Sequence, residues 1–177
     1  MRSIMMTVAV LVAVAAAQSP ASAQVTEITT EYLMTLYAPL ESFPIDSSTV
    51  VVNVREGGWV RGPRINGRII SPGGDWLRVM PSGARRLDVR LLVETDDGAL
   101  IHVTYNGVYV MSQEATDALA RGEVVTDKNV GYFVTAPMFQ TSSDRYDWLN
   151  GVQAVGKMIE LRSRGEHYIK YDIFLVR

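Results

Sequence analysis

The sequence predicts an all-β domain of about eight to ten short antiparallel strands, arranged as a barrel or a sandwich, with one short surface helix. Apolar and polar residues alternate with period two in several runs, as they do in strands with one buried face. Glycine, proline, aspartate and asparagine separate those runs and mark turns. After the N-terminal region, a single segment carries both the start and the stop signals of a helix.

Residues 1–23 have the features of a secretory signal peptide. A basic start, Met1-Arg2-Ser3, precedes an apolar run and then the small residues Ala21-Ser22-Ala23, the order that signal peptidase recognises. The apolar run is shorter than the roughly 20 residues of a membrane-spanning helix, which favours a cleaved signal over an anchor. We expect cleavage before Gln24, export to the periplasm or the cell exterior, and a single domain over residues 24–177.

Composition and charge narrow the classes of partner. The chain has 177 residues, 47% hydrophobic and 20% charged, as in ordinary soluble domains. Because it contains no cysteine, disulfides, thiolate zinc sites and a cysteine nucleophile are excluded. The formal net charge of −2 gives no case for nucleic acid or for an anionic membrane surface. No stable membrane insertion is expected. We expect a small organic molecule as the partner and leave a homo-oligomer open.

The first half of the mature chain alternates strands with glycine and proline turns. A loop from Pro39 to Ser48 is expected, followed by turns at Gly57-Gly58, Gly62-Pro63 and Pro72-Gly73-Gly74. Proline lacks the N–H that a strand ladder uses, so it is placed at strand ends or bulges. The strands expected here are residues 27–37, 49–55, 59–61, 65–70 and 75–79.

Residues 85–94 carry the clearest strand pattern, and residues 99–110 are the expected hairpin partner across Asp96-Asp97-Gly98. The apolar face of the first strand consists of Leu87, Val89, Leu91 and Val93, and that of its partner of Ile101, Val103 and Tyr105. Residues 112–122 then predict the helix, with Ser112 as N-cap and Gly122 as the stop. The last expected strands are residues 132–136, 148–161 and 168–176.

The turns carry an ordered set of motifs: Gly57-Gly58-Trp59, Gly73-Gly74-Asp75-Trp76, Asp96-Asp97-Gly98, Tyr105-Asn106-Gly107, Gly131-Tyr132-Phe133, Pro137-Met138-Phe139 and Tyr146-Asp147-Trp148-Leu149-Asn150-Gly151. This order resembles the domain-of-unknown-function family 3237, also called uncharacterised protein family 0311, over nearly the whole chain after residue 26. The resemblance implies a small closed antiparallel β-barrel, calycin-like, and no particular reaction. The chain departs from the family at Asp46-Ser47-Ser48, where a glycine is expected at the barrel rim.

Asp75 is the first candidate for chemistry. It follows two glycines and precedes Trp76, which places a carboxylate on a tight turn beside a large aromatic ring. An indole wall would desolvate the charged form and raise the carboxyl pKa, as a general acid or base near neutral pH requires. The structural alternative is an aspartate that caps its own turn.

Arg90 is the candidate anchor for an anion or a carbonyl group, since its guanidinium offers a rigid fork to planar oxygens. It shares a strand face with Asp88, and the two either form a solvated outward pair or line a polar pocket inside the barrel. The alternation of side chains along the strand does not show whether this face points outward or into the barrel.

Several aromatic residues either fill the core or line a ligand pocket, where tyrosine hydroxyls donate hydrogen bonds. We expect Tyr105 and Tyr146 as donors beside Asp75 and Arg90. Asn150 either adds an amide to the site or is a turn residue. The substrate-contacting candidates are Trp76, Tyr132, Phe139, Trp148 and Asn150.

Other kinds of site find little support. The two histidines, His102 and His167, have no evident third partner for zinc. The Asp96-Asp97-Gly98 turn lacks the long array of oxygen ligands that calcium needs, and no Gly-x-Ser-x-Gly motif is present. No metal and no cofactor are therefore expected.

Three functions fit this pattern. The first is a cofactor-free isomerase, cyclase or lyase that moves protons on a small organic molecule in the barrel mouth. The second is a lipocalin-like binding protein that uses the same pocket without catalysis, which an all-apolar lining would favour. The third is a structural envelope protein or an outer-membrane barrel. The sequence alone does not decide whether the protein is an enzyme.

Overall fold

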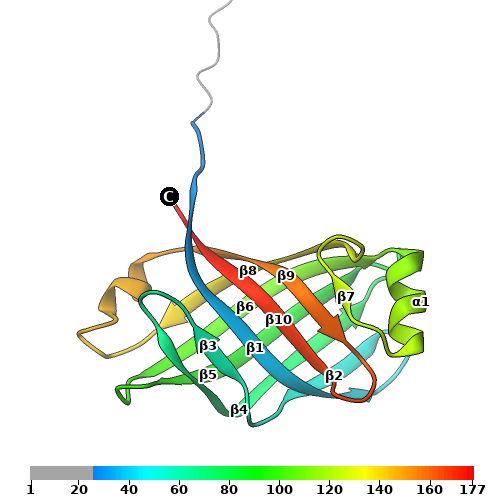
Figure 1. Ribbon diagram of the computed structural model, residues 1–177, viewed down its shortest axis with the longest axis horizontal. Helices are drawn as coiled ribbons and strands as arrows, with labels where there is room; N and C mark the ends of the chain where they lie inside the picture. The colour runs from blue at the N-terminus through cyan, green and yellow to red at the C-terminus, as the bar shows by residue number, and fades with distance from the viewer. Residues whose placement is uncertain (1–25) are drawn as a thin grey trace, which may run out of the picture.

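Ten strands form one antiparallel sheet that closes into a ring in the computed structural model, which describes residues 26–177 (Figure 1). The ring runs β10, β1, β2, β4, β5, β6, β8, β9, and pairing of β9 with β10 closes it. The strands are β1 (Thr30–Pro44), β2 (Thr49–Val54), β3 (Trp59–Arg61), β4 (Asn66–Val79), β5 (Arg85–Thr95), β6 (Leu100–Met111), β7 (Val125–Thr126), β8 (Gly131–Gln140), β9 (Ala154–Arg162) and β10 (Tyr168–Val176). The all-β barrel is confirmed, and the expected signal peptide, residues 1–23, lies outside the described residues.

The long strand β1 changes partners along its length. Its first part pairs with β3 on one side and its last part with β2, so that β2 and β3 share one place in the ring between β1 and β4. The sequence predicted a loop from Pro39, whereas β1 continues to Pro44. Pro39 lies where pairing with β10 ends and pairing with β2 begins, a position where its missing N–H is tolerated.

The predicted turn at Pro72-Gly73-Gly74 is wrong, because β4 runs through it. The register between β4 and β5 shifts between Ile70 and Gly74, so the glycines belong to a bulge within one strand. A Cβ atom on Gly73 would lie 3.2 Å from the Cβ of Leu91. The bulge therefore depends on close approach to a neighbouring strand.

Two helical segments interrupt the strands. Helix α1 (Gln113–Arg121) starts at Ser112, whose hydroxyl accepts a hydrogen bond from the Ala115 N–H at 2.9 Å, and ends at Gly122 with φ +81°, as predicted. It lies at one end of the barrel (Figure 1). The short 3₁₀ helix η1 (Asp147–Gly151) replaces the expected start of a strand at Trp148. Neither helical segment has the length and apolar character needed to cross a bilayer.

The interior divides into two halves along the barrel axis. We call the half away from α1 the packed half; its side chains are buried and contact one another. Its members include Leu33, Met34, Val60, Ile65, Ile69, Leu91, Val93, Ile101, Val103, Phe139, Tyr146 and Leu149. The half next to α1 holds the cavity described below.

Candidate functional site

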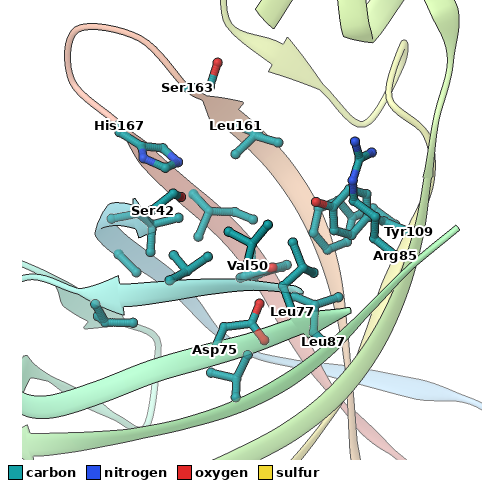
Figure 2. Close-up of a pocket in the computed structure, with 18 of the residues that line it drawn as sticks. Ser42, Val50, Asp75, Leu77, Arg85, Leu87, Tyr109, Leu161, Ser163 and His167 are labelled. Carbon is teal, nitrogen blue, oxygen red and sulfur yellow. The ribbon is translucent and has the colours of Figure 1, made fainter. Parts of the chain in front are cut away.

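A cavity of about 330 Å³ occupies the half of the barrel next to α1 (Figure 2). Most of its wall is aliphatic and is contributed by inward-facing residues of β1, β2, β4, β5 and β10. Ser42, Thr116 and Ser163 belong to its lining and are exposed, so the cavity reaches solvent at this end. The volume is at the small end of the range for ligand pockets.

Asp75 is the buried acid of this cavity. It faces inward from β4, opposite Val52 and Val89 of the neighbouring strands, and only 8% of its surface is exposed. Its carboxyl points into the cavity (Figure 2) and accepts one hydrogen bond, at 2.9 Å, from the backbone N–H of Asp88. Burial raises the pKa of Asp75 to about 6, and the nearby Asp88 charge adds to the rise, while the N–H opposes it.

An aromatic cluster forms the opposite wall. Tyr109 stacks on Phe133 with ring centroids 4.4 Å apart, and Tyr171 meets Phe133 edge-on at 5.7 Å and Tyr105 at 6.0 Å. Burial, with a further contribution from the Asp75 charge, raises the pKa of Tyr105 and Tyr171 well above the usual tyrosine range and that of Tyr109 to about 12. These phenols stay protonated at neutral pH and can donate hydrogen bonds.

Two basic side chains also reach the cavity. Arg85, at the start of β5, is half-buried, and its guanidinium carbon lies 5.4 Å from the centroid of the Tyr109 ring, a cation–π arrangement. His167 lies before β10, and burial lowers its pKa, which favours the neutral imidazole. Within residues 26–177, no group of three or more His, Cys, Asp or Glu residues is placed to hold a metal ion.

These groups suit proton transfer in a partly dry pocket. A carboxyl with a pKa near 6 exists in both protonation states close to neutral pH, as a general acid or base must. Neutral phenols placed near it can donate to an oxygen that gains negative charge. The aliphatic walls strengthen both interactions by excluding water.

Of the four predicted catalytic residues, the structure brings Asp75 and Tyr105 to the cavity and places the other two elsewhere. Arg90 points outward from β5 and pairs with Asp88 at 3.0 Å on the exposed face. Tyr146 is buried at the packed half, where its hydroxyl donates to Asp97 at 3.0 Å. Neither side chain lines the cavity.

The predicted substrate-contacting residues also lie outside the cavity lining. Trp76 and Tyr132 are 51% and 52% exposed on the outer face of the barrel. The desolvation of Asp75 therefore comes from the barrel interior and not from the Trp76 indole. Phe139 is buried in the packed half.

The last two candidates hold the loop around η1 in place. Trp148 lies beneath Arg64, whose guanidinium carbon is 3.7 Å from the indole centroid. Asn150 accepts from the Thr141 N–H and donates to the Thr141 carbonyl oxygen, both at 2.9 Å. Asn150 thus ties η1 to Thr141 and lies outside the cavity lining.

Sequence reasoning missed Arg85, Tyr109, Phe133, His167 and Tyr171 as cavity residues. Strand parity could have found two of them. Arg85 lies two residues before Leu87, and Tyr109 four residues after Tyr105, so each shares the buried face of its strand.

Comparison with known proteins gives the relatives of this chain. The family model described as protein of unknown function (DUF3237) matches residues 28–176. A UPF0311 protein of Clostridium acetobutylicum is 38% identical over 92 residues, 52% of this chain and 58% of the relative. Another, from Rhodopseudomonas palustris, is 37% identical over 100 residues, 56% of this chain and 65% of the relative. The chain thus matches less than two thirds of the length of either.

One relative carries an activity in its name. The hydroalkoxylation enzyme phnH of Penicillium herquei is 30% identical over 112 residues, which is 63% of this chain and 58% of that protein.

Solved structures share the barrel. The protein of unknown function from Rhodopseudomonas palustris superposes with a TM-score of 0.75 at 28% identity, covering 87% of this chain and 100% of that one. A β-barrel-like protein from Acinetobacter baumannii gives 0.69 at 30% identity, with 88% and 100% covered. An enzyme from Penicillium herquei gives 0.58 at 21% identity, with 88% and 99% covered, which is a likeness of fold alone.

Proposed function

The chain belongs to the DUF3237 family of proteins of unknown function, and on that premise we propose that it is a cofactor-free enzyme that transfers protons on a small organic molecule inside the barrel. The observation that carries this proposal is the Asp75 carboxyl, which faces an aliphatic cavity with a pKa of about 6. A buried carboxylate destabilises the folded state. Such groups occur preferentially at functional sites.

The named relative supports the same kind of chemistry. Hydroalkoxylation adds an O–H group across a carbon–carbon double bond: one C–O bond and one C–H bond form, and the O–H bond and the π bond break. When the hydroxyl and the double bond belong to one molecule, no atom is gained or lost, so no oxidant, reductant or co-substrate is needed. The protein has only to take a proton from oxygen and return one to carbon.

The cavity residues divide these tasks between them. Asp75 in its ionised form takes the proton of the attacking hydroxyl, and in its protonated form returns one to carbon. Tyr105 and Tyr171 donate hydrogen bonds to the oxygen that gains charge when the double bond is conjugated to a carbonyl group. The aliphatic wall holds the carbon skeleton.

A binding protein without catalysis is the second candidate, because most of the cavity wall is aliphatic. It uses the same cavity but gives Asp75 no chemical role. The two proposals differ in what happens to a ligand after it binds.

The test uses 2′-hydroxychalcone, which carries a phenol and a conjugated double bond and closes to flavanone by internal hydroalkoxylation. We expect the wild-type protein to accelerate ring closure over buffer, and Asp75→Asn to lower the rate about 10²-fold or more, since an amide takes no proton. Absorbance follows the conversion. Asp96→Asn, the same change in the exposed β5–β6 turn outside the cavity lining, is the matched control and should leave the rate within about twofold.

Binding of the chalcone without acceleration would favour the binding protein. Equal rates for wild type and Asp75→Asn would remove Asp75 from the chemistry.

We further propose that the protein acts after export, on the basis of the signal-like residues 1–23. Mass spectrometry of the mature protein should then find an N-terminus at Gln24, and a retained Met1 would contradict export.

A further inference from the structure

Arg85 differs from the other arginines near the cavity because it faces inward. Its neighbour along β5, Arg90, lies on the exposed face and is neutralised by Asp88. Within residues 26–177, Arg85 forms no ion pair, although it is half-buried and lines the cavity. A partly desolvated cation without a carboxylate partner is unfavourable unless something else neutralises it.

The charged groups of the cavity occupy separate places. None of the ion pairs within residues 26–177 joins Arg85 to Asp75, and Figure 2 shows them apart, with Leu77 and Leu87 between them in that view. The Asp75 end is buried, whereas the Arg85 guanidinium lies over the Tyr109 ring on the aromatic side. A ligand in the cavity thus meets a cation at one point, an acid at another and aliphatic or aromatic surface between them.

We propose that Arg85 is the specificity-determining residue of the site, and that the ligand is an aromatic or conjugated organic acid whose anionic oxygens bind the Arg85 guanidinium. This inference rests on the proposed function, since it assigns the substrate class of the same cavity. The planar fork of arginine matches a carboxylate or phenolate. The stacked Tyr109–Phe133 pair beside it offers aromatic ring edges against which a conjugated ring can pack.

The size of the cavity limits the rest of the ligand. At about 330 Å³ the cavity suits a compact ligand of about two rings. With the anion at Arg85, the body extends along Leu77 and Leu87 toward Asp75. The acid then faces an uncharged part of the ligand, where proton transfer takes place.

The test compares two probes that differ in charge and share the same ring system, 2-naphthoate and 2-naphthamide, at pH 7.5. Calorimetric titration of the wild-type protein should show binding of 2-naphthoate about tenfold tighter or more, the range of one hydrogen bond to a charged group. Arg85→Gln should abolish this preference without changing the affinity for 2-naphthamide more than about twofold. Arg85→Lys, which keeps the charge and loses the fork, should retain part of the preference.

Arg90→Gln is the matched control, because it makes the same substitution on the outer face of the same strand and should keep the full preference. A wild-type protein that binds neither probe or both equally overturns the inference, as does an Arg85→Gln variant that still prefers 2-naphthoate. These are binding measurements, so they are independent of turnover. If Asp75→Asn abolishes turnover but Arg85→Gln keeps the preference for 2-naphthoate, only this inference fails. If Arg85→Gln abolishes that preference but Asp75→Asn keeps turnover, only the enzyme proposal fails.

Discussion

Strand β5 contributes to both halves of the barrel interior, and its inward side chains differ between them. In the packed half, Leu91 and Val93 are each 1% exposed and touch other apolar residues. In the other half, Arg85, Leu87 and Val89 line the cavity. The same period of two thus builds a core at one end and a site at the other, and the difference lies in what faces each side chain across the barrel.

The buried carboxyl of Asp75 lowers the free energy of unfolding at neutral pH, and the packed half contributes no such effect. Well below pH 3.8, the ordinary pKa of the group, Asp75 is protonated in both the folded and the unfolded state. Between its ordinary pKa of 3.8 and its folded value of about 6, the unfolded chain ionises while the folded one holds its proton. Unfolding free energy therefore falls as pH rises through this window, by about 3 kcal/mol from this group, and changes no further above it.

The largest difference between the halves should appear on removing a leucine from each. Leu91→Ala leaves a hole in the packed half and should lower the free energy of unfolding by about 3 to 4 kcal/mol. Leu87→Ala, the same change four residues away on β5, should cost only about 1 to 2 kcal/mol, because that side chain already faces the cavity on one side. Urea unfolding at pH 7 measures both, and equal losses would contradict the division of the interior.

Removing the hydroxyl group from two buried tyrosines should change stability by a smaller amount. Tyr146→Phe removes a hydrogen bond to Asp97 in the packed half and should cost about 1 kcal/mol with turnover unchanged. Tyr105→Phe removes a hydroxyl of the cavity and should cost about 0.5 kcal/mol or less, yet lower turnover about tenfold. Thermal unfolding and the chalcone assay distinguish the two, and a loss of turnover in Tyr146→Phe would break the comparison.

The features that follow from local pattern were predictable from the sequence. Alternation along residues 85–94 predicted the buried face of β5, and Ser112 with Gly122 predicted the bounds of α1. The bulge at Gly73 was not predictable, because its cause is the closeness of Leu91 on another strand. Glycine occurs both in local turns and in bulges, so the sequence around Gly73 does not distinguish the two.

The site was predictable only in part for a related reason. Asp75 stood out through its chemistry, but finding Arg85 in place of Arg90 required knowing which strand face turns inward at that end. Arg85 lies two residues from Leu87 and therefore on the same face of β5. Closure of the sheet into a ring turns that face toward the interior. Tyr171 joins Tyr105 only because β10 returns to complete the barrel.

The central claim is that the cavity holds Asp75 as an acid that titrates near neutral pH. The direct measurement is the pKa of its side-chain carboxyl, from the ¹³C chemical shift followed between pH 3 and 8 in the ligand-free protein, with the signal assigned by its loss in Asp75→Asn. The account predicts a midpoint near 6, caused by burial in the aliphatic wall. A midpoint near 3.8, the ordinary value for aspartate, would show a solvated carboxylate and contradict the account.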